Sequence, residues 1–146
     1  MQRVKEKALS LLSSGTVDRV LGWSAGEFFY DLTPAVFTSV EDAEKRFVFS
    51  AFSGANLSKY LIAEARKGGK VAVFLKPCDS YSFVQLLKEH RIARESVYAV
   101  GVPCEGMCDM EKIKAKGISG VTGIEEQGET LRLRTLYGEE TLNRAD

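Results

Sequence analysis

Two short, valine-rich apolar runs, Val71–Leu75 and Val97–Val102, constrain the fold of this chain most. Continuous apolar runs of this kind are typical of parallel strands that are covered on both faces. The stretch between them places apolar residues at helical spacing, with Asp79 or Ser80 as the helix cap: Phe83, Leu86, Leu87 and His90. Strand, helix and strand make a βαβ unit, so we expect an α/β fold with a mainly parallel central sheet and flanking helices.

The segments on either side carry weaker patterns. We expect helices over residues 4–12, 57–65 and 109–116, and extended segments over residues 17–23, 27–30, 34–37 and 47–49. Residues 17–23 and 27–30 read as a hairpin, and Pro34 places the next short strand at a sheet edge. Asn56, Asp109 and the pair Ser39 and Asp42 are typical of helix starts. We expect His90, the single histidine, to be a packing residue at a helix end.

The C-terminal region has a different pattern. Residues 120–124 and 130–134 flank a turn at Gln127 and Gly128, and the second arm alternates apolar and polar residues. This alternation predicts a β-hairpin that exposes one face. With its 146 residues, the chain is long enough to bury a core, and we expect one α/β domain over residues 1–146.

All the cysteines follow the two apolar runs. Pro77-Cys78 follows the first run, Pro103-Cys104 follows the second, and Cys108 comes four positions later. Parallel neighbouring strands end at one edge of a sheet, where α/β proteins place ligands, so Cys78 and Cys104 should face one crevice. A helix that begins after Cys78 would favour its thiolate.

Three interpretations of the cysteines stay open. Three sulfurs at one edge suit ligation of a soft metal, most simply an iron–sulfur cluster held by Cys78, Cys104 and Cys108. Cys78 and Cys104 could instead form a metal-free redox pair, or all three could be small structural residues in an interaction module. Zinc fits less well, because no second Cys-x-x-Cys or nearby histidine completes a tetrahedral set.

Polar residues beside the Pro-Cys pairs are candidates for cofactor binding. Lys76, Asp79 and Ser80 surround the first pair and could hold a phosphate, or the pyrophosphate of a flavin such as FAD, at a helix N-terminus. Glu105 and Gly106 follow Cys104 and would shape the field at the second pair. The glycine-rich nucleotide fingerprints are not present in the sequence.

Composition narrows the function classes. Lys plus Arg and Asp plus Glu balance at 20 each, so no global field favours binding to nucleic acid. No apolar run reaches the length of a membrane span, and the charged N-terminus is unlike a signal peptide. We therefore expect a cytoplasmic protein with thiols rather than disulfides.

Three segments carry a resemblance to a known family. Residues 56–61, 76–80 and 100–107 resemble the N-terminal region of the beta subunits of deazaflavin-coenzyme (F-four-twenty) hydrogenases and dehydrogenases. They resemble still more the related iron–sulfur electron-transfer proteins that accompany hydrogenase, formate dehydrogenase and heterodisulfide reductase subunits. The resemblance covers roughly residues 1–115, and the paired Pro-Cys sites are its most specific part.

The resemblance implies an electron-transfer or docking domain of an oxidoreductase. It implies an iron–sulfur cluster of the 4Fe-4S type, a flavin in some members, and a redox partner subunit within an oligomer. Cys78, Cys104 and Cys108 are the positions that would carry over as ligands. Such proteins usually continue into a cysteine-rich, ferredoxin-like part. Residues 1–146 would therefore be either the N-terminal part of a longer iron–sulfur protein or a short relative that has lost or shares its cluster.

Overall fold

The computed structural model of this chain describes residues 2–143. The chain forms two compact units, Met1–Met107 (unit 1) and Cys108–Asp146 (unit 2). Each unit has a β-sheet of its own, with four strands in unit 1 and three in unit 2. That the two units act as one domain stays a prediction.

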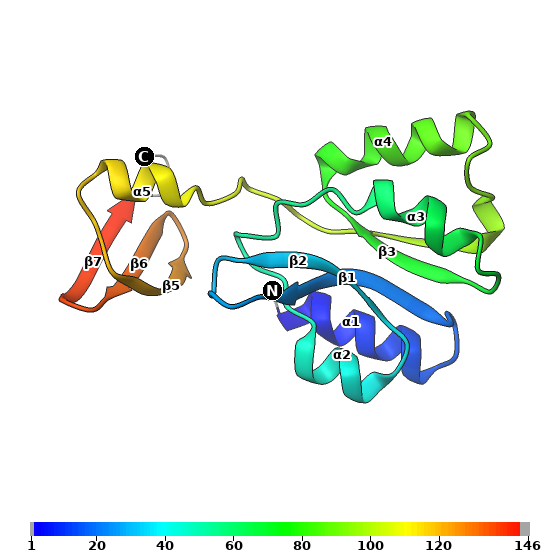
Figure 1. The fold of residues 1–146 in the computed structure, drawn as a ribbon, viewed down its shortest axis with the longest axis horizontal. Coiled ribbons are helices and arrows are strands. Elements are labelled where there is room, and N and C mark those ends of the chain that lie inside the picture. Colours follow the sequence, from blue (N-terminus) through cyan, green and yellow to red (C-terminus); the bar gives the residue numbers. More distant parts are fainter. Residues whose placement is uncertain (1, 144–146) are drawn as a thin grey trace. The chain divides into compact units, whose positions relative to one another are not determined.

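Unit 1 contains a mixed, mostly parallel sheet (Figure 1). Its strands are β1 (Arg19–Ala25), β2 (Leu32–Phe37), β3 (Val71–Leu75) and β4 (Val97–Gly101), in the order β2-β1-β3-β4. β3 is parallel to both β1 and β4, whereas β2 is antiparallel to β1 at one edge. The predicted α/β class, the βαβ unit and the edge position of Pro34 are confirmed.

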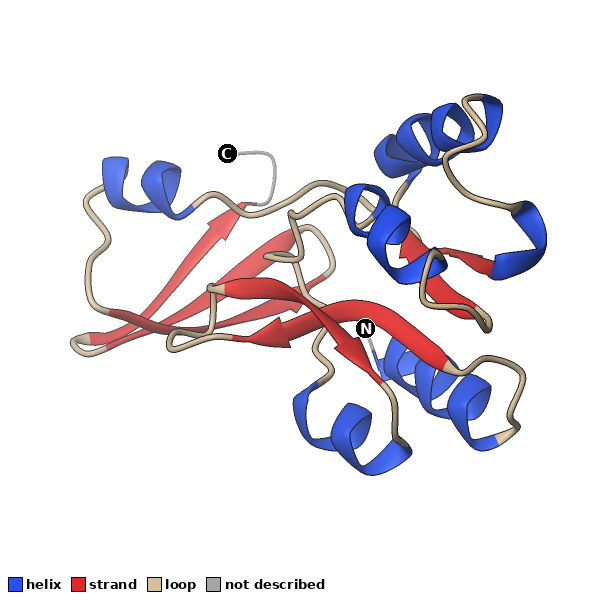
Figure 2. Cartoon of the chain, turned by 45° about the vertical axis from the view of Figure 1, so that its right-hand side comes forward, coloured by secondary structure: helices blue, strands red, loops and turns tan. Residues whose placement is uncertain are grey.

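Helices cover both faces of this sheet. They are α1 (Gln2–Ser13), α2 (Val40–Arg46), α3 (Ser58–Ala65) and α4 (Pro77–Lys88), with a short 3-10 helix, η1 (Arg94–Ser96), before β4. α1 and α2 lie on one face, and α3 and α4 lie on the other (Figures 1 and 2). Every residue of β3 is therefore buried, which is why its sequence is apolar without alternation.

The predicted hairpin partner at residues 27–30 is wrong. These residues form a bend and a turn, and the Gly26 N–H donates to Asp31 O across the loop at 2.6 Å. β1 therefore pairs with β2, which begins at Leu32. The aromatic rings of the loop pack on one another instead, with Phe28 and Tyr30 stacked at 5.4 Å between centroids.

The predicted extended segment at residues 47–49 and the role of His90 also need correction. Within residues 47–49, Phe47 forms a single bridge with Ser24, and the Val48 N–H donates to Trp23 O at 2.9 Å. His90 is exposed and has a φ of +51°, because α4 ends at Lys88, before the expected apolar stripe reaches it. The predicted packing role of His90 is therefore wrong.

Ser39 and Asp109 cap helices as predicted, whereas the cap of α3 is Leu57, and Asn56 lies one residue before it. Ser39 Oγ accepts a hydrogen bond from Asp42 N–H, Asn56 Oδ1 from Ser58 N–H, and Asp109 Oδ1 from Glu111 N–H. The start of α4 differs, because the helix begins at Pro77 and its cap is Lys76, not Asp79 or Ser80. Proline at the first helical position has no N–H to leave unpaired, which favours this earlier start.

Unit 2 is a short helix followed by an antiparallel meander. α5 (Met110–Ala115) precedes β5 (Val121–Gln127), β6 (Thr130–Thr135) and β7 (Gly138–Asn143), which pair in the order β5-β6-β7. β5 and β6 confirm the predicted hairpin, and Gly128 supplies the positive φ of its turn, +63°. β7 was missed because its residues are nearly all exposed and show no apolar alternation. In the part of the chain that the structure describes, no helix is long and apolar enough to span a bilayer.

Candidate functional site

The two Pro-Cys pairs leave the sheet of unit 1 in matched register. Leu75 of β3 pairs with Gly101 of β4, and the Val102 N–H extends the ladder by donating to Leu75 O at 2.9 Å. Cys78 and Cys104 each lie three positions after the residue of their strand in that last pair. Because the strands are parallel neighbours, both chain exits lie at the carboxyl edge of the sheet, as the sequence predicts.

Cys78 lies inside the first turn of α4 rather than before it, which corrects the expected helix start. Pro77 and Cys78 are the first two residues of the helix. The Cys78 side chain is exposed, and its Sγ lies 3.7 Å from Asp79 Oδ1, a contact in which the thiol donates. Cys78 is therefore a surface thiol beside the positive end of a helix dipole.

Cys104 lies in the loop that follows β4 and is half-buried. Its Sγ lies 3.9 Å from Gly106 O, which is a long and weak contact even for sulfur. Gly106 has a φ of +116°, a backbone conformation that glycine adopts without strain. Glu105 is exposed in the same loop.

Cys108 is half-buried and is the first residue of unit 2. Among the described residues, no group of three or more His, Cys, Asp or Glu side chains is placed to hold a metal ion. A 4Fe-4S cluster takes four thiolates, and the chain has three cysteines. The described residues therefore do not form a complete cluster site, and the convergence of all three sulfurs stays a prediction.

Lys76 is a buried ammonium with a full set of partners. Its side chain is 2% exposed, and Nζ lies 3.0 Å from Asp79 Oδ2. Nζ also donates to Ser53 O at 2.9 Å and to Ala55 O at 3.1 Å. An ammonium has three hydrogens, so these three oxygens account for all of them.

The indole of Trp23 completes the surroundings of this ammonium. Lys76 Nζ lies 4.9 Å from the centroid of the ring, within the range of a cation–π contact. Trp23 Nε1 donates to Ala55 O, the carbonyl that Lys76 also binds. The ion pair therefore connects β1, the loop before α3 and the first turn of α4.

Asp79 and Ser80 also have protein partners. Asp79 Oδ2 accepts a hydrogen bond from the Lys76 N–H at 3.2 Å, and the carboxylate is buried with its lysine. Ser80 Oγ donates to Pro77 O at 2.6 Å. These contacts give no support to a flavin phosphate at Lys76, Asp79 and Ser80, and that role stays a prediction.

Further contacts at the carboxyl edge of the sheet, the cysteine rim, were not predicted from the sequence. Ser58 Oγ donates to Asp79 O, and Asn56 Nδ2 donates to Ser82 Oγ, so the start of α3 is bonded to the start of α4. Ser53 and Ala55 take part through backbone carbonyls, which leave no mark in a sequence. The spacing of Lys76 and Asp79 was the one available signal, because residues three apart meet on a helix.

Comparisons with known proteins agree with the resemblance. No family model matches the chain. The F420-dependent formate dehydrogenase 1 subunit beta of Methanococcus maripaludis is 35% identical over 96 residues, which are 66% of this chain and 24% of that protein. The F420-dependent formate dehydrogenase subunit beta of Methanocaldococcus jannaschii is 33% identical over 96 residues, 66% of this chain and 25% of the relative. The chain thus spans about a quarter of the length of these curated relatives.

A solved structure shares the fold. A chain of the F420-reducing NiFe hydrogenase complex from Methanosarcina barkeri matches with a TM-score of 0.69 and 20% sequence identity. The match covers 94% of this chain and 53% of that chain. At this identity the match establishes the fold alone.

Proposed function

Because this chain is homologous to the beta subunits of F420-dependent formate dehydrogenases, we propose that it is an electron-transfer or docking region of an oxidoreductase. In this proposal unit 1 presents Cys78 and Cys104 as the functional thiols. A redox partner subunit, of the hydrogenase, formate dehydrogenase or heterodisulfide reductase type, binds at or near this rim. The region works inside a larger assembly and not alone.

One observation carries the proposal. Cys78 and Cys104 stand at equal offsets beyond the last paired residues of adjacent parallel strands. Each is preceded by a proline, which fixes φ and stiffens the path of the chain out of the strand. This repeated position at the carboxyl edge of the sheet, where α/β proteins place ligands, supports a functional role for the two thiols.

The proposed cofactor is an iron–sulfur cluster that this chain ligates in part. Cys78 and Cys104 supply two of its thiolates, Cys108 is a candidate for a third, and the remaining ligands come from other parts of the assembled enzyme. The division is compatible with the described residues, among which no group of three or more His, Cys, Asp or Glu side chains is placed to hold a metal ion. A cluster bound here would carry single electrons between partners.

The test is chemical analysis of the full-length protein after anaerobic purification with its co-purifying subunits. We expect iron and acid-labile sulfide in the wild-type protein, and loss of most of both in Cys78→Ser and in Cys104→Ser. Tyr81→Phe is the matched control, because Tyr81 is 82% exposed on the same helix as Cys78. Iron content that is unchanged in both serine variants would reject ligation.

A metal-free thiol pair is the second candidate function. The exposure of Cys78 favours it, because a redox thiol must be reached by its partner. A mild oxidant should then form a defined Cys78–Cys104 disulfide, detected by mass spectrometry of peptides. Visible absorbance of the freshly purified protein tests separately for a flavin.

A further inference from the structure

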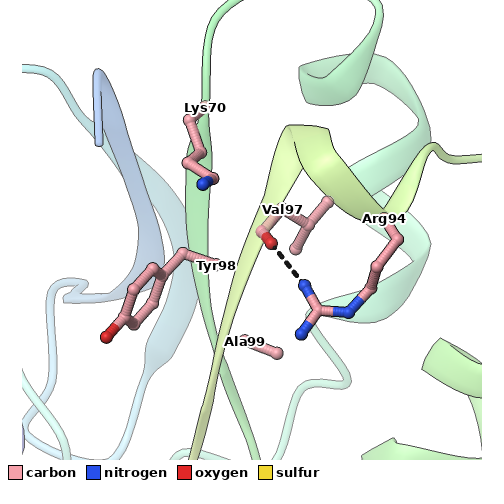
Figure 3. Close-up of a pocket in the computed structure, with 5 residues that line it drawn as sticks. All are labelled: Lys70, Arg94, Val97, Tyr98 and Ala99. Carbon is pink, nitrogen blue, oxygen red and sulfur yellow. Dashed lines mark hydrogen bonds between the residues drawn. The ribbon is translucent and has the colours of Figure 1, made fainter. Parts of the chain in front are cut away.

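A shallow cavity lies at the amino ends of β3 and β4, at the other end of these strands from the cysteines. It has a volume of about 400 Å³ and is lined by Lys70, Arg94, Val97, Tyr98 and Ala99 (Figure 3). Lys70 directly precedes β3, and Arg94 begins η1, which leads into β4. A volume of this size falls within the range of about 300–1,000 Å³ that small-molecule sites occupy.

The backbone of β4 offers hydrogen-bonding groups to this cavity. β4 is the last strand of its sheet, and alternate residues of a parallel strand direct both backbone groups to the same side. The Val102 N–H donates to Leu75 O of β3, so the odd-numbered residues Val97, Ala99 and Gly101 direct their groups to the free edge. Arg94 Nη1 donates to Val97 O at 2.8 Å, which is consistent with this direction. The Ala99 N–H is then a donor at the edge of the cavity.

Two cationic side chains stand at the walls of the cavity. Figure 3 shows the Arg94 side chain running back along β4 towards Ala99, held by its bond to Val97 O. That bond uses one of the five N–H groups of the guanidinium, so most of its donors are left for a ligand. Lys70 supplies the second positive charge from the other wall.

Nearby carboxylates do not neutralise the cavity by a direct ion pair in the described part of the chain. Asp18 Oδ2 accepts from the backbone N–H of Lys70, not from its ammonium. Glu95 is exposed next to Arg94, and the salt bridges of the described residues include neither Arg94 nor Lys70. The two cations that line the cavity, Lys70 and Arg94, are therefore not held in salt bridges among the described residues, although the carboxylates of Asp18 and Glu95 belong to residues nearby.

We propose that this cavity binds a phosphate-bearing small molecule. The guanidinium of Arg94 and the Ala99 N–H hold the phosphate oxygens, because a planar fork and a backbone donor suit this group better than an ammonium alone. Lys70 balances the second negative charge of the phosphate. The phenol ring of Tyr98, from whose centroid Lys7 Nζ lies 5.9 Å away, lines the cavity for the rest of the ligand. The site is separate in the fold from the cysteine rim and does not depend on its proposed role.

The test is titration of the isotopically labelled 146-residue chain with glycerol phosphate and with inorganic phosphate, followed by nuclear magnetic resonance at constant ionic strength. We expect a saturable shift of the Ala99 amide and the Arg94 Nε resonances. Arg94→Gln and Lys70→Gln should each raise the dissociation constant about tenfold, the effect of losing one charge-assisted hydrogen bond. Arg91→Gln is the control, because Arg91 is exposed beside the same turn but does not line the cavity.

Two results would overturn the proposal. One is the absence of saturable shifts at Ala99 for either phosphate compound. The other is an increase in the dissociation constant for Arg91→Gln that is as large as the increase for Arg94→Gln and Lys70→Gln. Such a result would show that binding depends on the overall positive charge and not on this cavity. Binding of inorganic phosphate as tight as that of glycerol phosphate would restrict the ligand to the phosphate group and remove the role of Tyr98. Arg94→Gln removes the hydrogen bond to Val97 O and could disturb the fold for that reason. Lys70→Gln does not remove this bond, so it tests the cavity independently.

Discussion

At the scale of single residues, Lys76 shows how a charged side chain can be part of the core. Its ammonium is enclosed by two carbonyls, one carboxylate and the face of Trp23. Burying an unpaired charge is costly, whereas this ammonium has a partner for each hydrogen. The lysine thus fixes the loop before α3 and the first turn of α4, which carries Cys78.

Lys76→Met should destabilise the protein strongly. The change leaves the Asp79 carboxylate buried without its cation, and breaking a buried pair in this way costs about 3–5 kcal/mol. Urea unfolding followed by circular dichroism measures the free energy of unfolding. Lys88→Met is the matched control, because Lys88 is exposed on the same helix and should change little. A loss of less than about 1 kcal/mol for Lys76→Met, the range of a surface pair, would contradict the role of the buried Lys76–Asp79 ion pair.

The sequence could predict that Lys76 stands beside a Pro-Cys pair but not that it is buried. The decisive partners are the carbonyl oxygens of Ser53 and Ala55, which any residue type could supply. The position of Cys78 and Cys104 at the carboxyl edge of the sheet was predictable, because each follows an apolar run that is typical of a buried strand. The contacts of the rim depend on loop geometry, which residue types do not determine.

At the scale of elements, β1 depends on a glycine that makes room for an aromatic ring. A Cβ at Gly22 would lie 2.3 Å from Cε2 of Phe47. The Phe47 ring is held between Phe37 and Phe74, at 5.5 and 5.4 Å between centroids, and is 1% exposed. The ring therefore cannot move aside without disturbing the core.

Gly22→Ala should lower the free energy of unfolding by about 1–3 kcal/mol, the cost of overpacking a core. Gly101→Ala is the control within the same sheet, because a Cβ there meets no heavy atom within 4 Å. Chemical denaturation of both variants provides the comparison. If the two substitutions lower the free energy of unfolding equally, the contact with Phe47 does not exclude a side chain at position 22.

The exposed face of α2 carries a pH-dependent pair. A hydrogen bond from Arg46 lowers the pKa of the Asp42 carboxyl below its ordinary value of 3.8. A carboxyl with a lowered folded-state pKa stabilises the fold above pH 3.8, and the contribution is lost as the pH falls through the lowered value. The pair therefore contributes to stability at neutral pH, and this contribution is lost only in acid.

Asp42→Asn should flatten the acid limb of the stability curve below about pH 4. Thermal unfolding of wild-type and variant protein across this pH range is the measurement. Glu44→Gln, exposed on the same helix, is the control for removing one carboxylate. An equally steep acid limb in wild type and Asp42→Asn would exclude a contribution from this pair.

The elements differ in how far the sequence could predict them. β3 and β4 were predictable because burial on both faces requires an unbroken apolar run. The conformation of residues 27–30 was not predictable from the sequence. Aromatic residues are common in strands, but they are equally compatible with a loop in which their rings stack on each other. β7 was missed because its side chains face solvent and its place is set by pairing with β6.

At the scale of the whole molecule, the chain combines a mostly parallel α/β unit with a separate three-stranded unit. Its homology to the formate dehydrogenase beta subunits extends over 66% of the chain but only about a quarter of those proteins. Among the described residues, no group of three or more His, Cys, Asp or Glu side chains is placed to hold a metal ion. The central claim is that Cys78 and Cys104 act together when the enzyme is assembled.

Alkylation resolved by cysteine tests this claim most directly. The full-length protein, purified anaerobically with its partner subunits, is treated with iodoacetamide before and after removal of iron by a chelator, and each cysteine peptide is quantified by mass spectrometry. We predict that Cys78 and Cys104 are both protected at first and both react after iron is removed, because thiolates bound to metal are not free nucleophiles. Rapid alkylation of Cys78 at the same rate before and after chelation would contradict the account.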